Sequence, residues 1–327
     1  MPSAPAAGYR TIPWWRPEGI QRLLFRPHRL AQAWGHVPVA VRIAPGDDGS
    51  DVTVWSYDPS RDGPCVHIDF PSSRTFRRLF RRWRVLADAI VAGAAEHPGR
   101  GFHDVRIDLN DGVAAAGADG VLAFARPIGA TTRLIPNTYL LGHRRPAPAA
   151  LDWARKSDTL YFRGTSTGDV SYETNTRVAL CRMAREVPRA DCKISRTKQV
   201  DGGFAARLQD DGLTAARAPL DDMNRHRFLV DADGNATSWD RFLWIGTFGG
   251  VPIRFEPSWE ECWHHLLVDG VNSVTSTRGT LADTVAGLRD DDRRSRAIAA
   301  RAAALARDHL SPPALRRMLV DTLRSAA

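Results

Sequence analysis

The alternation of hydrophobic and polar residues along the first half of the chain predicts short strands followed by one long helix. The strands are expected at 37–43, 52–57, 66–70, 105–109 and 121–125, and the helix at 75–95. The segment 143–150 has two prolines among polar and small residues and predicts a linker. We therefore expect a domain boundary between residues 148 and 149.

In the second half, predicted strands alternate with predicted helices. The strands are expected at 159–162, 227–230 and 251–255, and the helices at 174–186, 239–247, 281–288, 293–309 and 314–325. This alternation indicates a parallel sheet covered on both faces, with ligands bound beyond the carboxyl ends of the strands. The expected fold class is α/β, with an N-terminal domain at 1–148 and a C-terminal domain at 149–327.

Length and composition narrow the class of protein. The chain has 327 residues, of which 43% are hydrophobic and 25% charged, which excludes a mostly disordered protein. The start of the chain has no apolar signal core, and no run reaches the roughly 18–20 apolar residues of a membrane span. Four cysteines without CxxC spacing argue against a disulfide scaffold or a zinc site. We expect a cytoplasmic protein.

The chain carries a net charge of +8, and nearly all of its basic residues are arginines. This arginine content reflects either genome composition or a surface that binds anions such as phosphates, nucleic acid or lipid headgroups. A basic polyanion- or nucleic-acid-binding protein is therefore an alternative function. The sequence shows no helix-turn-helix, RRM or zinc-finger pattern, so no nucleic-acid partner is expected.

Arginines alternate with bulky apolar residues in the segment Arg74–Arg84. Phe76, Leu79, Phe80 and Trp83 share one face of a helix by their spacing. Such a helix either lies on an anionic membrane surface or packs into the core with a solvated arginine face. The segment thus indicates a possible peripheral membrane contact.

A loop of small and hydroxyl residues follows the predicted strand at 159–162. Gly164, Thr165, Ser166 and Thr167 allow backbone amides to approach an anion, and the next helix adds partial positive charge at its start. Arg163 and Arg177 lie on either side of this loop as candidate phosphate ligands. The Walker and GxGxxG patterns are absent, and an ordinary strand, turn and capped helix remains an alternative.

A second strand, loop and helix of the same design occupies residues 228–241. Asp231 and Asp233 form a DxD pair, which either ligates a metal or satisfies loop amides, and Ser238 is a candidate helix cap. Two such loops facing one diphosphate would form a nucleotide-sugar site.

These residues resemble the signature of glycosyltransferase family 90. The resemblance rests on Phe162-Arg163-Gly164 with the following Thr-Ser-Thr-Gly, on Asp233-Gly234-Asn235, and on Ser238-Trp239-Asp240. It extends through 252–256 and Trp259 to the C-terminal helices, and so covers about residues 100–325. The family contains bacterial lipopolysaccharide-modifying transferases and eukaryotic protein O-glucosyl- and O-xylosyltransferases.

The resemblance implies a GT-B-like fold of two Rossmann-like domains facing a central cleft, with C-terminal helices packing back across. It implies an inverting, metal-independent glycosyltransferase without a cofactor. Such an enzyme would move a glucose- or xylose-class sugar from a UDP-sugar to a hydroxyl of a glycan or lipid-linked acceptor, as in lipopolysaccharide biosynthesis. It would work in the cytoplasm, with possible contact at the inner membrane face. A DxD metal-dependent glycosyltransferase remains an alternative.

The resemblance also implies residue roles. The catalytic base falls on Asp111, in the loop that follows a predicted strand, with Asp108 as the alternative three residues upstream. No residue is expected to bind a metal. The expected donor-binding residues are Arg163, Gly164, Thr165, Ser166, Thr167, Arg177, Asp233, Ser238, Trp239 and Arg241.

Overall fold

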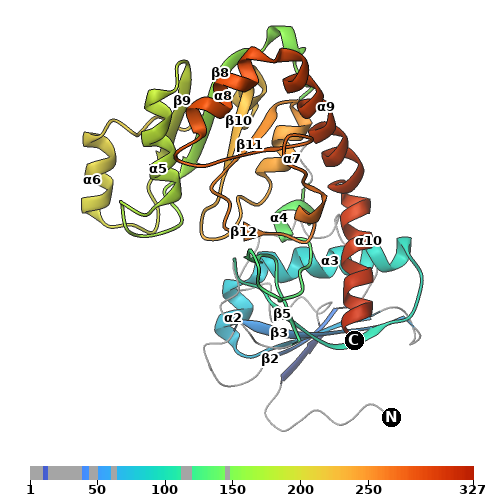
Figure 1. Ribbon diagram of the computed structural model, residues 1–327. Coiled ribbons are helices and arrows are strands. Elements are labelled where there is room, and N and C mark those ends of the chain that lie inside the picture. The colour runs from blue at the N-terminus through green and yellow to red at the C-terminus, as the bar shows by residue number, and fades with distance from the viewer. Residues whose placement is uncertain (1–9, 14–38, 44–50, 60–64, 112–119, 144–147) are drawn as a thin grey trace. The chain divides into compact units, whose positions relative to one another are not determined.

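The computed structural model describes residues 10–13, 39–43, 51–59, 65–111, 120–143 and 148–327, which form two compact units (Figure 1). The first unit contains the described residues up to Phe124 together with Ala130–Gly142 and Pro312–Ala327. The second contains Ala125–Gly129 and the described part of His143–Ser311. The predicted division into 1–148 and 149–327 differs from this one mainly because the last helix belongs to the first unit.

The first unit is built on a mixed six-stranded sheet of order β1-β2-β4-β3-β5-β6. Its strands are β1 (Arg10–Pro13), β2 (Val39–Ile43), β3 (Val52–Asp58), β4 (Cys65–Phe70), β5 (Phe102–Asp108) and β6 (Val121–Leu122). Strand β3 is antiparallel to β4 and β5, whereas β2 with β4 and β5 with β6 are parallel. A Rossmann-like domain has a parallel sheet, so this sheet differs from the one expected for the N-terminal half.

The arginine-rich segment forms two helices, α2 (Ser73–Arg78) and α3 (Phe80–Glu96), instead of one. Ser72 caps α2, and its hydroxyl accepts a hydrogen bond from the amide of Thr75 at 3.1 Å. Phe76, Phe80 and Trp83 are buried and pack against one another, with Trp83 only 1% exposed. The apolar face therefore lies in the core and is not available to a membrane. Peripheral contact through Arg74–Arg84 stays a prediction that rests on the exposed arginines alone.

The last helix, α10 (Pro312–Ala326), packs on α3 within the first unit. A β-carbon at Gly93 would lie 2.8 Å from the side chain of Val320, so this glycine permits the close approach. Arg316 also forms an ion pair with Glu96, in which Nε donates to Oε2 at 2.9 Å. The short helix α4 (Thr138–Leu141) completes the helical layer.

The second unit contains a five-stranded parallel sheet of order β13-β11-β10-β8-β9, which confirms the α/β class. The strands are β8 (Ser157–Thr165), β9 (Ala190–Arg196), β10 (His226–Ala232), β11 (Val251–Phe255) and β13 (Val274–Ser276). A separate pair, β7 (Arg126–Pro127) with β12 (Trp259–Glu260), is antiparallel. The sequence did not predict the edge strand β9, in which only Cys192 and Ile194 are buried.

Alternate side chains of β8 face two different cores, as expected for a sheet covered on both sides. Leu160 and Phe162 lie in the larger core, with residues of α5 (Thr176–Met183), α6 (Gly202–Asp210), α8 (Leu281–Asp290) and α9 (Asp292–His309). Tyr161 lies in the other core with residues of α7 (Arg241–Thr247). The unit also contains short 3₁₀ helices, at Trp153–Arg155, Ala184–Glu186, Leu220–Arg225 and His264–Leu266. Within the described part of the chain, every helix is too short or too polar to span a bilayer.

Candidate functional site

The strand order of the second unit marks where a parallel sheet of this type binds its ligand. In chain order β8 is the first strand, β9 the second and β10 the third, so the sheet reads 2-1-3-4-5. The chain leaves β8 toward one edge of the sheet and later continues on its other side. The switch point therefore lies between the carboxyl ends of β8 and β10, where such sheets bind ligands. Both predicted loops begin there.

Arg177, in the first turn of α5, joins the two loops. Its Nη1 donates to the carbonyl of Thr165 at 3.2 Å, to Thr165 Oγ1 at 3.1 Å and to Thr167 Oγ1 at 2.8 Å. Its Nε and Nη2 donate to the carbonyls of Ala232 and Asp233 at 3.0–3.2 Å. Arg177 is only 7% exposed, and burial lowers its pKa to about 10. The arginine expected to bind phosphate thus holds the site together.

Glycines allow the two loops to approach each other closely. A β-carbon at Gly234 would lie 2.8 Å from Arg177 Nη2 and 2.9 Å from Thr167 Oγ1. Gly168 has φ +125°, which disfavours any other residue, and its amide donates to Asn235 Oδ1 at 3.1 Å. The predicted pairing of the loops after β8 and β10 is therefore present in the fold.

The start of α5 is capped by a side chain of the protein. Asn175 Oδ1 accepts hydrogen bonds from the amides of Arg177 and Val178, each at 3.1 Å. The helix start was expected to offer its amides to an anion, but Asn175 occupies two of them because Asn is a favoured helix cap.

Ser166 connects the β8 loop to the residues that follow β9. It is fully buried, its hydroxyl donates to the carbonyl of Lys198 at 2.9 Å, and it accepts from the amide of Lys198 at 2.8 Å. Ser166 is therefore a structural residue. The contact brings two exposed cations, Arg196 and Lys198, to the carboxyl end of the sheet. Neither residue was a candidate from the sequence, because the pattern of residues 190–196 did not predict a strand there.

Arg163 does not join the cluster around Arg177. Its Nη1 donates to the carbonyl of Asp191 at 2.9 Å, and its Nη2 pairs with Asp191 Oδ2 at 2.6 Å. Its guanidinium lies 5.0 Å from the centre of the Tyr161 ring, on the same side of the strand. Gly164, the next residue, has no room for a side chain, because a β-carbon would lie 2.5 Å from the Phe162 ring.

Arg241, the first residue of α7, is the arginine whose surroundings best fit the predicted role of binding the donor. Its Nη2 donates to the carbonyl of Arg163 at 2.8 Å, and its guanidinium stacks 4.8 Å from the centre of the Phe162 ring. Among the described residues, its buried Nε has no hydrogen-bond partner. Burial lowers the pKa of Arg241, with the nearby Asp231 opposing that effect. A buried donor without a partner is uncommon and fits an anionic ligand.

The polar residues after β10 are held by other parts of the protein. Ser238 donates to the carboxylate of Asp231, and Trp239 adopts φ +61°, an uncommon conformation for a bulky residue. Asp233 Oδ2 accepts from the amides of Ser258 at 2.8 Å and Trp259 at 3.0 Å. Both aspartates of the DxD pair therefore have protein partners. Among the described residues, no three His, Cys, Asp or Glu side chains form a group suited to a metal ion.

Asp233 gives the site a measurable pH dependence. Its burial raises the carboxyl pKa from 3.8 to about 6, against the effect of the two amide hydrogen bonds. The folded state thus binds the proton more tightly than the unfolded state, so ionised Asp233 destabilises the fold above pH 6 and ceases to do so below about pH 4. We expect Asp233→Asn to stabilise the protein at pH 8 by up to about 3 kcal/mol.

This gain should shrink toward zero as the pH falls from 6 to 4. Urea unfolding of wild type and Asp233→Asn at several pH values measures it. Asp210→Asn, at an exposed position of α6, is the control and should show no such trend. A constant difference between Asp233→Asn and wild type would contradict the expectation.

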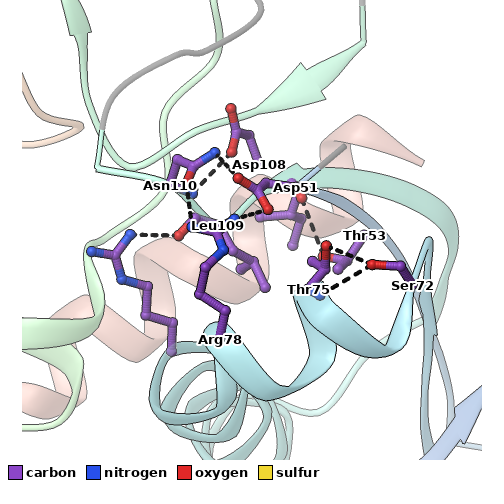
Figure 2. Close-up of polar contacts among 10 residues, drawn as sticks. Asp51, Thr53, Ser72, Thr75, Arg78, Asp108, Leu109 and Asn110 are labelled. Carbon is purple, nitrogen blue, oxygen red and sulfur yellow. Dashed lines mark hydrogen bonds and ion pairs between the residues drawn. The ribbon is translucent and has the colours of Figure 1, made fainter. Parts of the chain in front are cut away.

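The two candidate bases lie at the end of β5 in the first unit. The Asp108 side chain is buried, with 2% exposure for the residue, and its Oδ1 accepts from the amide of Asn110 at 2.9 Å. The Asp111 side chain is 33% exposed and forms an ion pair with Arg82. Figure 2 shows Asp51, Arg78 and Asn110 grouped beside this turn. Asp111 is the more accessible of the two carboxylates.

Comparisons with known proteins give distant structural likenesses. No protein-family model matches the sequence, and no curated protein does. Anabaena HepE in complex with UDP-glucose is similar over 50% of this chain and 48% of its own, with 14% identity and a TM-score of 0.37. The C-terminal domain of LpcC from Francisella tularensis, a glycosyl transferase group 1 family protein, is similar over 46% of this chain and 85% of its own. Its identity is 12% and its TM-score 0.33.

The pneumococcal O-GlcNAc transferase GtfA in complex with UDP and GlcNAc is similar over 53% of this chain and 36% of its own. Its identity is 14% and its TM-score 0.37. The chain thus spans about half the length of HepE.

Proposed function

We propose that this protein is an inverting, metal-independent glycosyltransferase. It moves a glucose- or xylose-class sugar from a UDP-sugar to a hydroxyl of a cell-envelope glycan such as lipopolysaccharide. The observation that carries the proposal is the pair of loops after β8 and β10, which Arg177 joins at the switch point of a parallel sheet. These are the loops whose residues resemble family 90, and that resemblance supplies the sugar and acceptor classes.

The diphosphate of the donor binds at the unpartnered Nε of Arg241 and at the hydroxyls of Thr165 and Thr167. The two hydroxyls lie 2.9 Å apart and are half-buried. Arg177 lies close enough to Arg241 for their charges to repel each other, and each lacks full solvation. An anion placed beside them relieves this repulsion. Arg196 and Lys198 add positive charge at the same end of the sheet.

The same charges support the proposal of metal independence. UDP gains negative charge as it leaves, and preorganised cations stabilise that charge most in the transition state. Arg177, which is buried, and Arg241, which is half-buried, can therefore perform the task that a divalent ion performs elsewhere. The metal-dependent alternative needs Asp231 and Asp233 as ligands, but Ser238 and the amides of 258–259 hold them.

On the acceptor side, Asp111 removes the proton of the attacking hydroxyl. The oxygen then attacks the anomeric carbon from the face opposite UDP, the bond to UDP breaks, and the configuration inverts. This proposal assigns Asp111 to the acceptor and the loops of the second unit to the donor. The two roles can then be tested by separate variants.

The test is calorimetric titration with UDP, with and without EDTA. We expect UDP to bind wild type equally well in both. Arg241→Ala should weaken binding about ten- to a hundredfold, because a charge-assisted hydrogen bond contributes roughly 1.5–3 kcal/mol. Arg301→Ala, at an exposed position of α9, is the matched control and should bind as wild type does. UDP release from UDP-glucose and UDP-xylose then identifies the sugar.

Two outcomes decide against parts of the proposal. If folded wild type does not bind UDP in either buffer, the nucleotide-sugar site is wrong. If binding disappears in EDTA and returns with Mn²⁺ or Mg²⁺, the metal-dependent alternative is right and Asp231 and Asp233 become its ligands.

A further inference from the structure

Arg82, in the first turn of α3, holds the loop that carries Asp111. Its Nη1 donates to the carbonyl of Leu109 at 2.6 Å, while its Nη2 forms the ion pair with Asp111 Oδ1. One guanidinium therefore binds both the main chain and the carboxylate of the same short loop. Since the guanidinium is planar and rigid, this arrangement fixes the direction of the carboxylate relative to the end of β5.

A second arginine supports the loop from α2. Arg78 forms an ion pair with Asp51, and its Nη1 lies 3.4 Å from Asn110 Oδ1 (Figure 2). Asn110 Nδ2 donates to Asp51 Oδ2 at 2.5 Å, and the Asn110 amide donates to Asp108. The residue immediately before Asp111 is thus tied to Asp51, which directly precedes β3, to the end of β5 and to α2. These contacts hold Asn110 independently of Arg82, so the ion pair with Arg82 acts on the Asp111 side chain while the bond to the Leu109 carbonyl adds to the hold on the main chain.

The helix that presents Arg82 is itself fixed. The next residue, Trp83, is 1% exposed, and its indole donates to the carbonyl of Phe76 at 3.2 Å. Leu79 and Leu86, three residues before Arg82 and four after it, are buried as well. Ion pairs that solvent can reach contribute little to stability, and both side chains of this pair are only partly buried, at 20% and 33% exposure. Because Arg82 lies on a rigid helix, its guanidinium can hold the Asp111 carboxylate in one position.

We propose that Arg82 is a positioning residue: it holds the Asp111 carboxylate in the direction needed to take the proton of the acceptor hydroxyl. The inference rests on the proposed function and adds to it a residue that the sequence did not single out. Arg82 belongs to the first unit and is not among the residues proposed to bind the donor, so we expect its effect in turnover and not in UDP affinity. It acts through Asp111, so its effect should depend on Asp111.

The experiment compares Arg82→Ala, Arg82→Lys, Asp111→Asn and the double variant Arg82→Ala/Asp111→Asn. Turnover is measured as UDP release from UDP-glucose with water as acceptor, and UDP affinity by calorimetry. We expect Arg82→Ala to lower kcat at least tenfold with unchanged UDP affinity, and Arg82→Lys to retain more activity than Arg82→Ala. The double variant should be no slower than Asp111→Asn, because residues that act as one unit are not additive.

Arg81→Ala is the control, since Arg81 is exposed on the same helix. It should keep wild-type turnover, and thermal unfolding should show that all variants are folded. The inference is overturned if the kcat of Arg82→Ala lies within about twofold of the wild-type value. It is equally overturned if adding Arg82→Ala to Asp111→Asn lowers kcat by the same factor by which Arg82→Ala lowers the kcat of wild type. It is also overturned if Asp111→Asn is fully active. Failure of wild type to bind UDP is a different result, which rejects the donor site and the proposed function with it.

Discussion

Asp111→Asn is expected to lower the rate of sugar transfer about 10²–10⁴-fold, the usual contribution of a general base, while leaving UDP affinity nearly unchanged. The amide keeps the shape of the carboxylate but cannot accept the proton of the acceptor hydroxyl. Asp111 belongs to the first unit and the donor loops to the second, so the change leaves the residues around Arg177 as they are. UDP release and calorimetric titration measure the two quantities.

Asp108→Asn is the matched comparison, because both residues belong to the same turn. The Asp108 carboxylate is buried and accepts from the amide of Asn110, and an amide oxygen can accept that hydrogen bond as well. We therefore expect Asp108→Asn to retain most of the turnover. If Asp111→Asn keeps more than about a tenth of the wild-type kcat, its assignment as base is wrong. Loss of turnover confined to Asp108→Asn would move the role three residues upstream, to Asp108.

Arg177→Met is expected to destabilise the second unit strongly, by at least about 3 kcal/mol. Methionine has a similar length but no hydrogen-bond donors. The carbonyls of Thr165, Ala232 and Asp233 would lose the hydrogen bonds that Arg177 donates to them, and each unsatisfied buried group costs about 1–3 kcal/mol. Urea unfolding followed by circular dichroism measures the loss. UDP binding should disappear as well, because the two loops would separate.

Arg182→Met is the control for this prediction. Arg182 lies on the same helix, is exposed, and forms an exposed ion pair with Glu173 at 3.1 Å. Its replacement should change stability by no more than about 0.5 kcal/mol. If Arg177→Met unfolds at the same urea concentration as Arg182→Met, Arg177 does not hold the two loops together, and direct binding of the donor becomes its more reasonable role.

The sequence correctly predicted the helices and strands whose hydrophobic pattern is contained in a short stretch of residues. Six elements lie close to their expected ranges: the strands β8, β10 and β11 and the helices α7, α8 and α9. A buried strand or an amphipathic helix has a characteristic spacing of hydrophobic residues, which can be recognised within a short stretch of sequence. The class α/β followed from their alternation. The sequence did not reveal β9, since an edge strand with two buried residues has too weak a pattern, and it ran α2 and α3 together across Leu79.

Side-chain partners were decided by the tertiary structure. From the sequence, Arg163 and Arg177 were equivalent candidates beside one loop, yet one pairs with Asp191 on the neighbouring strand and the other is buried between two loops. The contact between Arg82 and Asp111 joins residues 29 positions apart, and that between α10 and α3 joins the end of the chain to the first unit. Local sequence determines which elements form, because their hydrogen bonds and periods involve near neighbours. Which charged groups meet depends on strand order and helix packing, and these are set by burial over the whole unit.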